Sequence, residues 1–169
     1  MKIPERQMLH IDAGRCIECE ACAAACSQVG FRKGTSVMWL VSVGSSEARK
    51  IPFTCLHCEN APCARACPTE AIKVTGRGIV LTADESRCIA CRNCVVACPF
   101  GIPVLQENSY MMVKCDLCFD RLQSGSGPLC VAVCPTEAIR FQPPETLSLD
   151  KRLSVVERFA GSTSILAPP

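Results

Sequence analysis

The chain has 169 residues and 16 cysteines, but only six Phe, one Tyr and one Trp are available for an aromatic core. We therefore expect a group bound to sulfur to replace part of that core. The formal net charge of +2 without a basic stripe argues against a nucleic-acid partner. No apolar run approaches the roughly 20 residues of a membrane helix, so we expect no membrane span of its own.

The cysteines fall into four groups along the chain. Group one is Cys16, Cys19, Cys22 and Cys26; group two is Cys55, Cys58, Cys63 and Cys67; group three is Cys88, Cys91, Cys94 and Cys98; group four is Cys115, Cys118, Cys130 and Cys134. Groups one and three share the spacing C-x2-C-x2-C-x3-C within RCIECEACAAAC and RCIACRNCVVAC, and groups two and four both end in CPTEAI. This pattern is an internal repeat.

The cysteine spacing favours one of three possible sulfur chemistries. Residues 1–11 carry neither an apolar signal region nor a twin arginine, so we expect a cytoplasmic chain rather than a disulfide framework. Structural zinc uses widely separated CxxC pairs, whereas C-x2-C-x2-C-x3-C-P is a signature of [4Fe–4S] ligation. We expect all sixteen cysteines to bind iron in four [4Fe–4S] clusters, which would bring the net charge of the loaded protein to about −6.

Short strands are expected beside the cysteine groups, taken here in chain order. Residues 8–11 precede group one, and residues 37–43 are apolar enough for a strand over a cluster. Between groups two and three, residues 71–74 and 79–82 form a hairpin that turns at Gly76 and Gly78. The polar segment 119–129 within group four is expected to be a loop, and residues 138–141 form the last strand.

The C-terminal tail has a weaker pattern. After Pro143 and Pro144, a possible short helix places apolar residues on one face, at Leu149, Leu153, Val156 and Ala160. This face docks on the protein's own body or contacts a neighbouring subunit, and the sequence leaves both open.

The pairing of the groups follows from the segments that connect them. In two-cluster ferredoxins the fourth cysteine of each run ligates the other cluster. The central hairpin closes groups two and three into one unit, and the strands at 8–11 and 138–141 lack other partners, so they join groups one and four. The predicted ligand sets are Cys16, Cys19, Cys22 and Cys134; Cys55, Cys58, Cys63 and Cys98; Cys88, Cys91, Cys94 and Cys67; and Cys115, Cys118, Cys130 and Cys26. Pairing of group one with two and three with four remains the alternative.

These elements predict an α+β fold of two ferredoxin-like di-cluster units, with the inner unit inserted in the outer one. The outer unit comprises residues 8–26 plus 110–141, and the inner unit comprises residues 55–99. Residues 27–54 are a connecting insertion, and residues 142–169 are a C-terminal tail with a possible subunit contact.

Three segments carry a family resemblance: FTCLHCENAPCARACP, CIACRNCVVACPFG and MVKCDLCFDRLQSGSGPLCVAVCP. With them, residues 8–145 resemble the four-cluster electron-transfer subunits of molybdenum and tungsten oxidoreductases, such as dimethyl-sulfoxide reductase, formate dehydrogenases and tungsten aldehyde oxidoreductases, and related hydrogenase-linked polyferredoxins. Ser27 follows the last cysteine of group one where Pro follows the other three, which leaves that backbone freer.

The resemblance implies a hetero-oligomer of anaerobic metabolism in which this chain has no catalytic site of its own. It implies electron transfer between a catalytic Mo/W-pterin subunit and an acceptor subunit that holds a flavin or binds NAD. A hydrogenase-linked complex is the alternative, and a zinc-binding interaction module is a more remote one.

Charged side chains beside the cysteines are candidates for tuning the cluster potentials. They are His57, Arg65, Arg87, Arg92 and Lys114. For each of them, the competing expectation is a solvated side chain on a loop.

Overall fold

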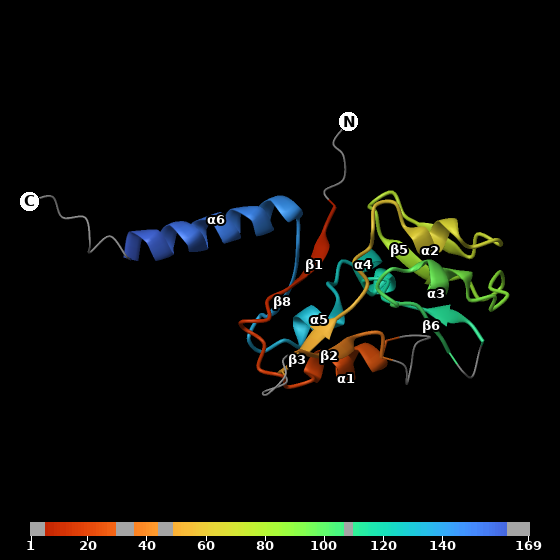
Figure 1. The fold of residues 1–169 in the computed structure, drawn as a ribbon, viewed down its shortest axis with the longest axis horizontal. Helices are drawn as coiled ribbons and strands as arrows, with labels where there is room; N and C mark the ends of the chain where they lie inside the picture. Colours follow the sequence, from red (N-terminus) through yellow and green to blue (C-terminus); the bar gives the residue numbers. More distant parts are fainter. Residues whose placement is uncertain (1–5, 30–35, 44–48, 107–109, 162–169) are drawn as a thin grey trace, which may run out of the picture.

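The computed structural model describes residues 6–29, 36–43, 49–106 and 110–161. They form a small mixed structure of short helices and strands, as the α+β expectation requires (Figure 1). The described strands form four antiparallel pairs: β1 (Met8–Ile11) with β8 (Ile139–Gln142), β2 (Trp39–Val43) with β3 (Arg49–Phe53), β4 (Ile72–Val74) with β5 (Val80–Ala83), and β6 (Val104–Leu105) with β7 (Met112–Val113). The described helices are α1 (Ala21–Ser27), α2 (Pro62–Arg65), α3 (Asn93–Ala97), α4 (Phe119–Gln123), α5 (Leu129–Ala132) and α6 (Pro144–Gly161).

The two ends of the patterned region lie side by side. β1 pairs with β8 in the register Met8 to Gln142 and Ile11 to Ile139, and the Ile139 side chain is buried. The helices that follow and precede these strands, α1 and α5, also pack together. The strands expected at 8–11 and 138–141 are therefore confirmed, the second shifted by one residue.

The central hairpin β4–β5 forms because a glycine occupies its tight turn. The Gly78 amide donates to the Thr75 carbonyl at 2.9 Å, and the Thr75 amide donates to the Ile79 carbonyl at 2.8 Å. Gly78 has φ +74°, a conformation that L side chains rarely adopt. The strands on either side of this turn match the expected ones to within a residue, and α2 packs against α3 beside them.

The insertion between groups one and two contributes a further antiparallel strand pair. The expected strand at 37–43 is present from Trp39 onward as β2, and Val37 and Met38 just before it are buried. β3 follows it antiparallel. Residues 30–35 and 44–48 of this insertion lie outside the described residues.

The segment expected to be a loop, 119–129, is helical in its first half. α4 spans Phe119 to Gln123, and Phe119 and Leu122 pack against the buried core. Residues three apart lie on one face of a helix, so this pair supplies an apolar face that the polar composition of the segment conceals. The loop expectation is therefore wrong for α4 and holds for the turn after it.

The C-terminal helix α6 extends away from the rest of the described chain (Figure 1). Leu147 in its first turn is buried, but Leu149, Leu153 and Val156 are 49%, 51% and 60% exposed. The predicted apolar face thus forms but does not dock on the protein's own body; the Ala160 side chain and residues 162–169 lie outside the described part. None of the described helices is both long and apolar enough to cross a membrane.

Candidate iron–sulfur centres

The four CxxC loops share one unusual backbone conformation. The residue just before the second cysteine has a positive φ in every loop, namely 62° at Glu18, 48° at His57, 54° at Ala90 and 59° at Leu117. Non-glycine residues rarely adopt this conformation, and it clusters at sites that clamp a ligand. In two loops it directs the amide of this residue to the first cysteine: His57 N–H donates to Cys55 Sγ at 3.5 Å, and Leu117 N–H to Cys115 Sγ at 3.4 Å. The sequence repeat is therefore also a backbone repeat.

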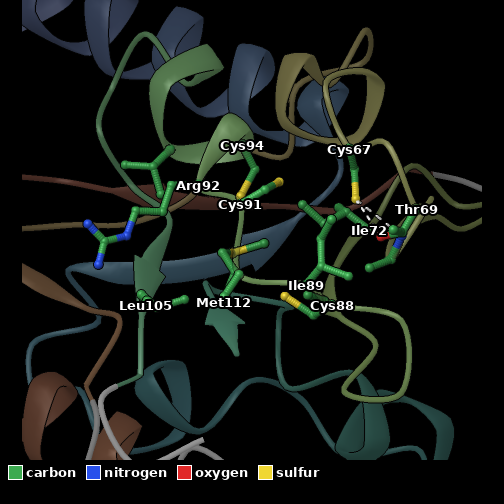
Figure 2. A pocket seen from close by; sticks show the side chains of 14 residues that line it. Cys67, Thr69, Ile72, Cys88, Ile89, Cys91, Arg92, Cys94, Leu105 and Met112 are labelled. Atoms are coloured by element: carbon green, nitrogen blue, oxygen red, sulfur yellow. Dashed lines mark hydrogen bonds between the residues drawn. The ribbon is translucent and has the colours of Figure 1, made fainter. Parts of the chain in front are cut away.

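One apolar pocket lies between groups two and three. Four cysteines line it, Cys67 from group two and Cys88, Cys91 and Cys94 from group three, together with Ile89, Leu105 and Met112. Figure 2 shows the four sulfur atoms around this pocket and the Arg92 side chain pointing away from it. The pocket encloses about 390 Å³, part of it open to solvent. Burial raises the pKa of the Cys94 thiol to about 11.

A second pocket of about 380 Å³ lies between groups one and four. Its cysteines occupy the equivalent positions of the repeat: Cys16, Cys19 and Cys22 from group one and Cys134 from group four. Leu40 of β2 and Pro52 of β3 complete its apolar wall, so the expected strand does lie over this site. The two pockets match in size and in composition because they arise from the same repeated elements.

The remaining cysteines approach one another inside the protein. Burial raises the pKa of the Cys63 thiol, and the neighbouring Cys55 and Cys98 thiols add to this rise. Burial likewise raises the pKa of Cys130, with contributions from Cys115, Cys118 and Cys26. Cys22 of group one also contributes to the rise at Cys130, so the thiols of groups one and four lie close together. That each predicted ligand set holds one cluster stays a prediction.

The last cysteines of groups two and four receive extra hydrogen bonds. Cys67 Sγ lies 3.6 Å from the Thr69 hydroxyl and accepts from the Ala71 amide at 3.2 Å, and Cys134 Sγ lies 3.9 Å from the Thr136 hydroxyl. Burial alone would raise the pKa of both thiols, yet hydrogen bonds from the hydroxyls and backbone amides bring each pKa below its usual value. Donors that favour the thiolate also stabilise it as a ligand of iron.

These two threonines are functional candidates that the sequence-based selection of residues missed. The signal was present, because the repeated CPTEAI places a hydroxyl two residues after each cysteine.

A second contribution that the sequence-based selection missed comes from β3. Arg49 donates to the Cys16 carbonyl at 2.7 Å and, like Lys50, bonds to Glu18, which braces the group one loop. Nothing in the sequence near group one indicates this contact.

The five candidate tuning residues divide into two classes. Three of them are exposed, as expected for solvated side chains on loops: Arg65, Arg87 and Arg92. Lys114 is fully buried and His57 is 5% exposed, so that expectation is wrong for these two. His57 Nδ1 accepts from the Val80 amide at 3.1 Å, and burial, with Lys114 and Arg6 nearby, lowers the pKa of His57 to about 3.

The donor set fits iron–sulfur clusters. The two pockets combine soft sulfur ligands with apolar walls, and amide donors face the sulfur of Cys55, Cys67 and Cys115. His57 Nε2 is buried and has no hydrogen-bond partner among the described residues, which is costly unless a further acceptor lies beside it. Within the described ranges, no three Cys, His, Asp or Glu side chains converge closely enough to hold a single ion.

Comparison with known proteins agrees with this assignment. The 4Fe–4S dicluster domain family matches residues 47–143, which is more than half of the chain. The chain is 42% identical over 143 residues to the thiosulfate reductase electron transfer subunit PhsB of Salmonella typhi, covering 79% of this chain and 73% of that protein. It is 35% identical to the B subunit of anaerobic dimethyl sulfoxide reductase of Escherichia coli (81% and 73% covered) and 30% identical to the formate dehydrogenase iron-sulfur subunit of Wolinella succinogenes (98% and 95% covered).

Proposed function

This chain belongs to the 4Fe–4S dicluster family of iron–sulfur electron-transfer subunits, and we propose that it carries electrons through four [4Fe–4S] clusters between a catalytic subunit and an acceptor subunit. The observation that carries the proposal is the repeat of four cysteine groups, which build two matching pockets that each hold three cysteines of one group and the last cysteine of another. Each cluster supplies a site that gains or loses one electron without bonds being made or broken.

The ligation in this proposal is crossed between groups. The outer pair of clusters takes Cys16, Cys19, Cys22 with Cys134 and Cys115, Cys118, Cys130 with Cys26; the inner pair takes Cys55, Cys58, Cys63 with Cys98 and Cys88, Cys91, Cys94 with Cys67. Support comes from the two pockets, each lined by three cysteines of one group and the last cysteine of another. For the other two sets, Cys98 is among the thiols that raise the pKa of Cys63 and Cys26 is among those that raise the pKa of Cys130, which agrees with crossed ligation.

The arrangement in this proposal is a ferredoxin-like unit at 55–99 inserted in another made of residues 8–26 and 110–141. The outer unit is supported by the pairing of β1 with β8 and the packing of α1 on α5. The inner unit is supported by the β4–β5 hairpin and the packing of α2 on α3. Residues 27–54 act as a connection, of which Leu40 and Pro52 cover the group one site, and residues 142–169 serve as a tail for subunit contact.

Electrons enter and leave this chain through groups one and three. The second cysteine of each CxxC pair is exposed in these two groups, at Cys19 and Cys91, whereas Cys118 of group four is buried and Cys58 of group two is half-buried. Ile17 and Ile89 beside the exposed cysteines are 60% and 63% exposed, so each loop offers an apolar contact surface to a partner. Shorter distance to a redox partner speeds electron transfer, which favours the exposed loops as terminals.

The partners in this proposal are a Mo/W-pterin catalytic subunit at one terminal and a flavin- or NAD-binding subunit, or another acceptor, at the other. The named relatives are subunits of thiosulfate reductase, dimethyl sulfoxide reductase and formate dehydrogenase. The chain itself performs no substrate chemistry in this scheme and works in the cytoplasm. The exposed apolar face of α6 supports an additional subunit contact.

Metal analysis tests the proposal. Protein purified without oxygen should be brown, with about sixteen iron and sixteen acid-labile sulfide per chain, since each cluster holds four of each. Colourless protein that carries zinc would refute electron transfer, and about eight iron per chain in fully loaded protein would refute the count of four clusters. Molybdenum or tungsten in the co-purified complex would identify the catalytic partner.

A further inference from the structure

Lys114 is a fully buried lysine that lies, in space, between cysteine groups two and four. It directly precedes Cys115, the first cysteine of group four, and follows strand β7. Its side chain has 0% exposure. The ammonium donates to the backbone carbonyl of Cys115 at 2.9 Å and to the carbonyl of Val80 in β5. Lysine is almost never fully buried, so this placement requires a reason.

Val80 of β5 connects Lys114 to group two. The Val80 carbonyl accepts from Lys114, and the Val80 amide donates to Nδ1 of His57, which lies between the first two cysteines of that group. The lysine is therefore within electrostatic reach of groups two and four at once.

The backbone around Lys114 is fixed at the junction of two strands. The Thr82 hydroxyl of β5 donates to the Met112 carbonyl at 3.2 Å and accepts from the Lys114 amide at 3.3 Å. β5 and β7 pack against each other at this point. The position of the ammonium is thus set by main-chain geometry rather than by a flexible loop, as a residue that tunes a fixed site requires.

Charge accounts for the burial. An oxidised [4Fe–4S] core with four thiolates carries about −2, and reduction adds one further negative charge. A cation nearby stabilises the reduced form more than the oxidised form. Because water does not reach Lys114, this attraction is screened much less than that of an exposed arginine.

We propose that Lys114 is the shared counter-charge of the clusters held by groups two and four, and that it raises the reduction potential of both. This inference rests on the proposed four-cluster function and adds a positioning residue to it. Asp116, which is also buried, provides a test in the opposite sense. Its carboxylate accepts from the Cys118 amide at 2.9 Å within the group four loop, so its negative charge lowers the potential that Lys114 raises.

The experiment is a potentiometric titration of the anaerobic complex, followed by the electron paramagnetic resonance of each reduced cluster. Lys114→Met removes the charge and keeps most of the length of the unbranched side chain. For the two clusters of groups two and four, we expect the equilibrium constant of reduction to fall at least tenfold, about 59 mV for a one-electron couple. The other two clusters should change less, and Asp116→Asn should shift the group four cluster in the opposite direction.

Two control variants separate charge from shape. Lys114→Arg keeps the charge and should keep all four potentials close to those of the wild type. Arg65→Met removes an exposed cation within group two, where water screens it, and should shift the potentials less than Lys114→Met does. If Lys114→Met does not load its clusters, Lys114→Gln, which retains a donor without the charge, replaces it in the comparison.

Two outcomes would overturn the inference. Unchanged potentials of both clusters in fully loaded Lys114→Met or Lys114→Gln protein would remove the tuning role, as would equal shifts of all four clusters. The iron and sulfide content distinguishes this failure from failure of the proposed function. Protein with about sixteen iron and unaltered potentials refutes only the role of Lys114.

Discussion

The hydroxyl of Thr69 offers a direct test of how the cysteine sites are tuned. It lies 3.6 Å from Cys67 Sγ, and removal of this hydroxyl by Thr69→Val leaves the shape of the side chain nearly unchanged. The Ala71 amide at 3.2 Å remains in place, so the cysteine keeps part of its stabilisation. We expect the reduction potential of the cluster that Cys67 ligates to become more negative, because the reduced cluster carries more charge on sulfur and loses more from the missing donor.

The distance sets the size of this effect. A hydrogen bond to a charged group contributes about 1.5–3 kcal/mol at good geometry. At 3.6 Å to sulfur the bond is weak, and only the difference between its strengths in the two redox states shifts the potential. We therefore expect about 0.3–0.7 kcal/mol, which corresponds to roughly 15–30 mV for a one-electron couple. Thr136→Val should shift the reduction potential of its cluster by a smaller amount, because the Thr136 hydroxyl lies farther from the sulfur, 3.9 Å from Cys134 Sγ.

The assay is the same potentiometric titration, with iron content as a control for intact sites. Crossed ligation assigns Cys67 to the group three cluster, so the shift should appear there. A shift of the group two cluster instead would refute the crossed assignment. Equal and large shifts in Thr69→Val and Thr136→Val would refute the dependence on distance.

Three other perturbations test the remaining features. Cys98→Ser should damage the cluster of the first three cysteines in group two, and damage confined to the group three cluster, seen by spectroscopy, would show that ligation is not crossed. A Leu153→Glu, Val156→Glu double variant should weaken assembly with partner subunits several-fold in a pull-down of the complex, because it places charges on the exposed apolar face of α6. Ser154→Glu is the control on the opposite side of the helix. Equal assembly of the wild type and both variants would remove the interface role. Removal of iron with a chelator should lower the thermal unfolding midpoint measured by circular dichroism, since five of the buried core residues are cysteines of the predicted sites; an unchanged midpoint would mean that the fold is stable without its clusters.

The local elements could be predicted because short-range chemistry determines them. The strands at 8–11, 71–74 and 79–82 follow from apolar runs bounded by turn residues, and Gly78 adopts the positive φ that its turn requires. The cysteine spacing indicated iron–sulfur chemistry because three thiols this close in sequence can surround one corner of a cluster. Polar composition misled the prediction at α4, where an apolar pair three residues apart decides the conformation.

The tertiary structure decided the environments that spacing does not encode. Five charged or titratable side chains beside cysteines look alike in sequence, yet three are exposed, while His57 and Lys114 are buried around Val80. That difference depends on β5, which supplies both its amide and its carbonyl from a distant part of the chain. The sequence by itself determined which atoms can bind iron. Only packing between segments far apart determined which charges lie near those atoms without water to screen them, and therefore which residues can set a potential.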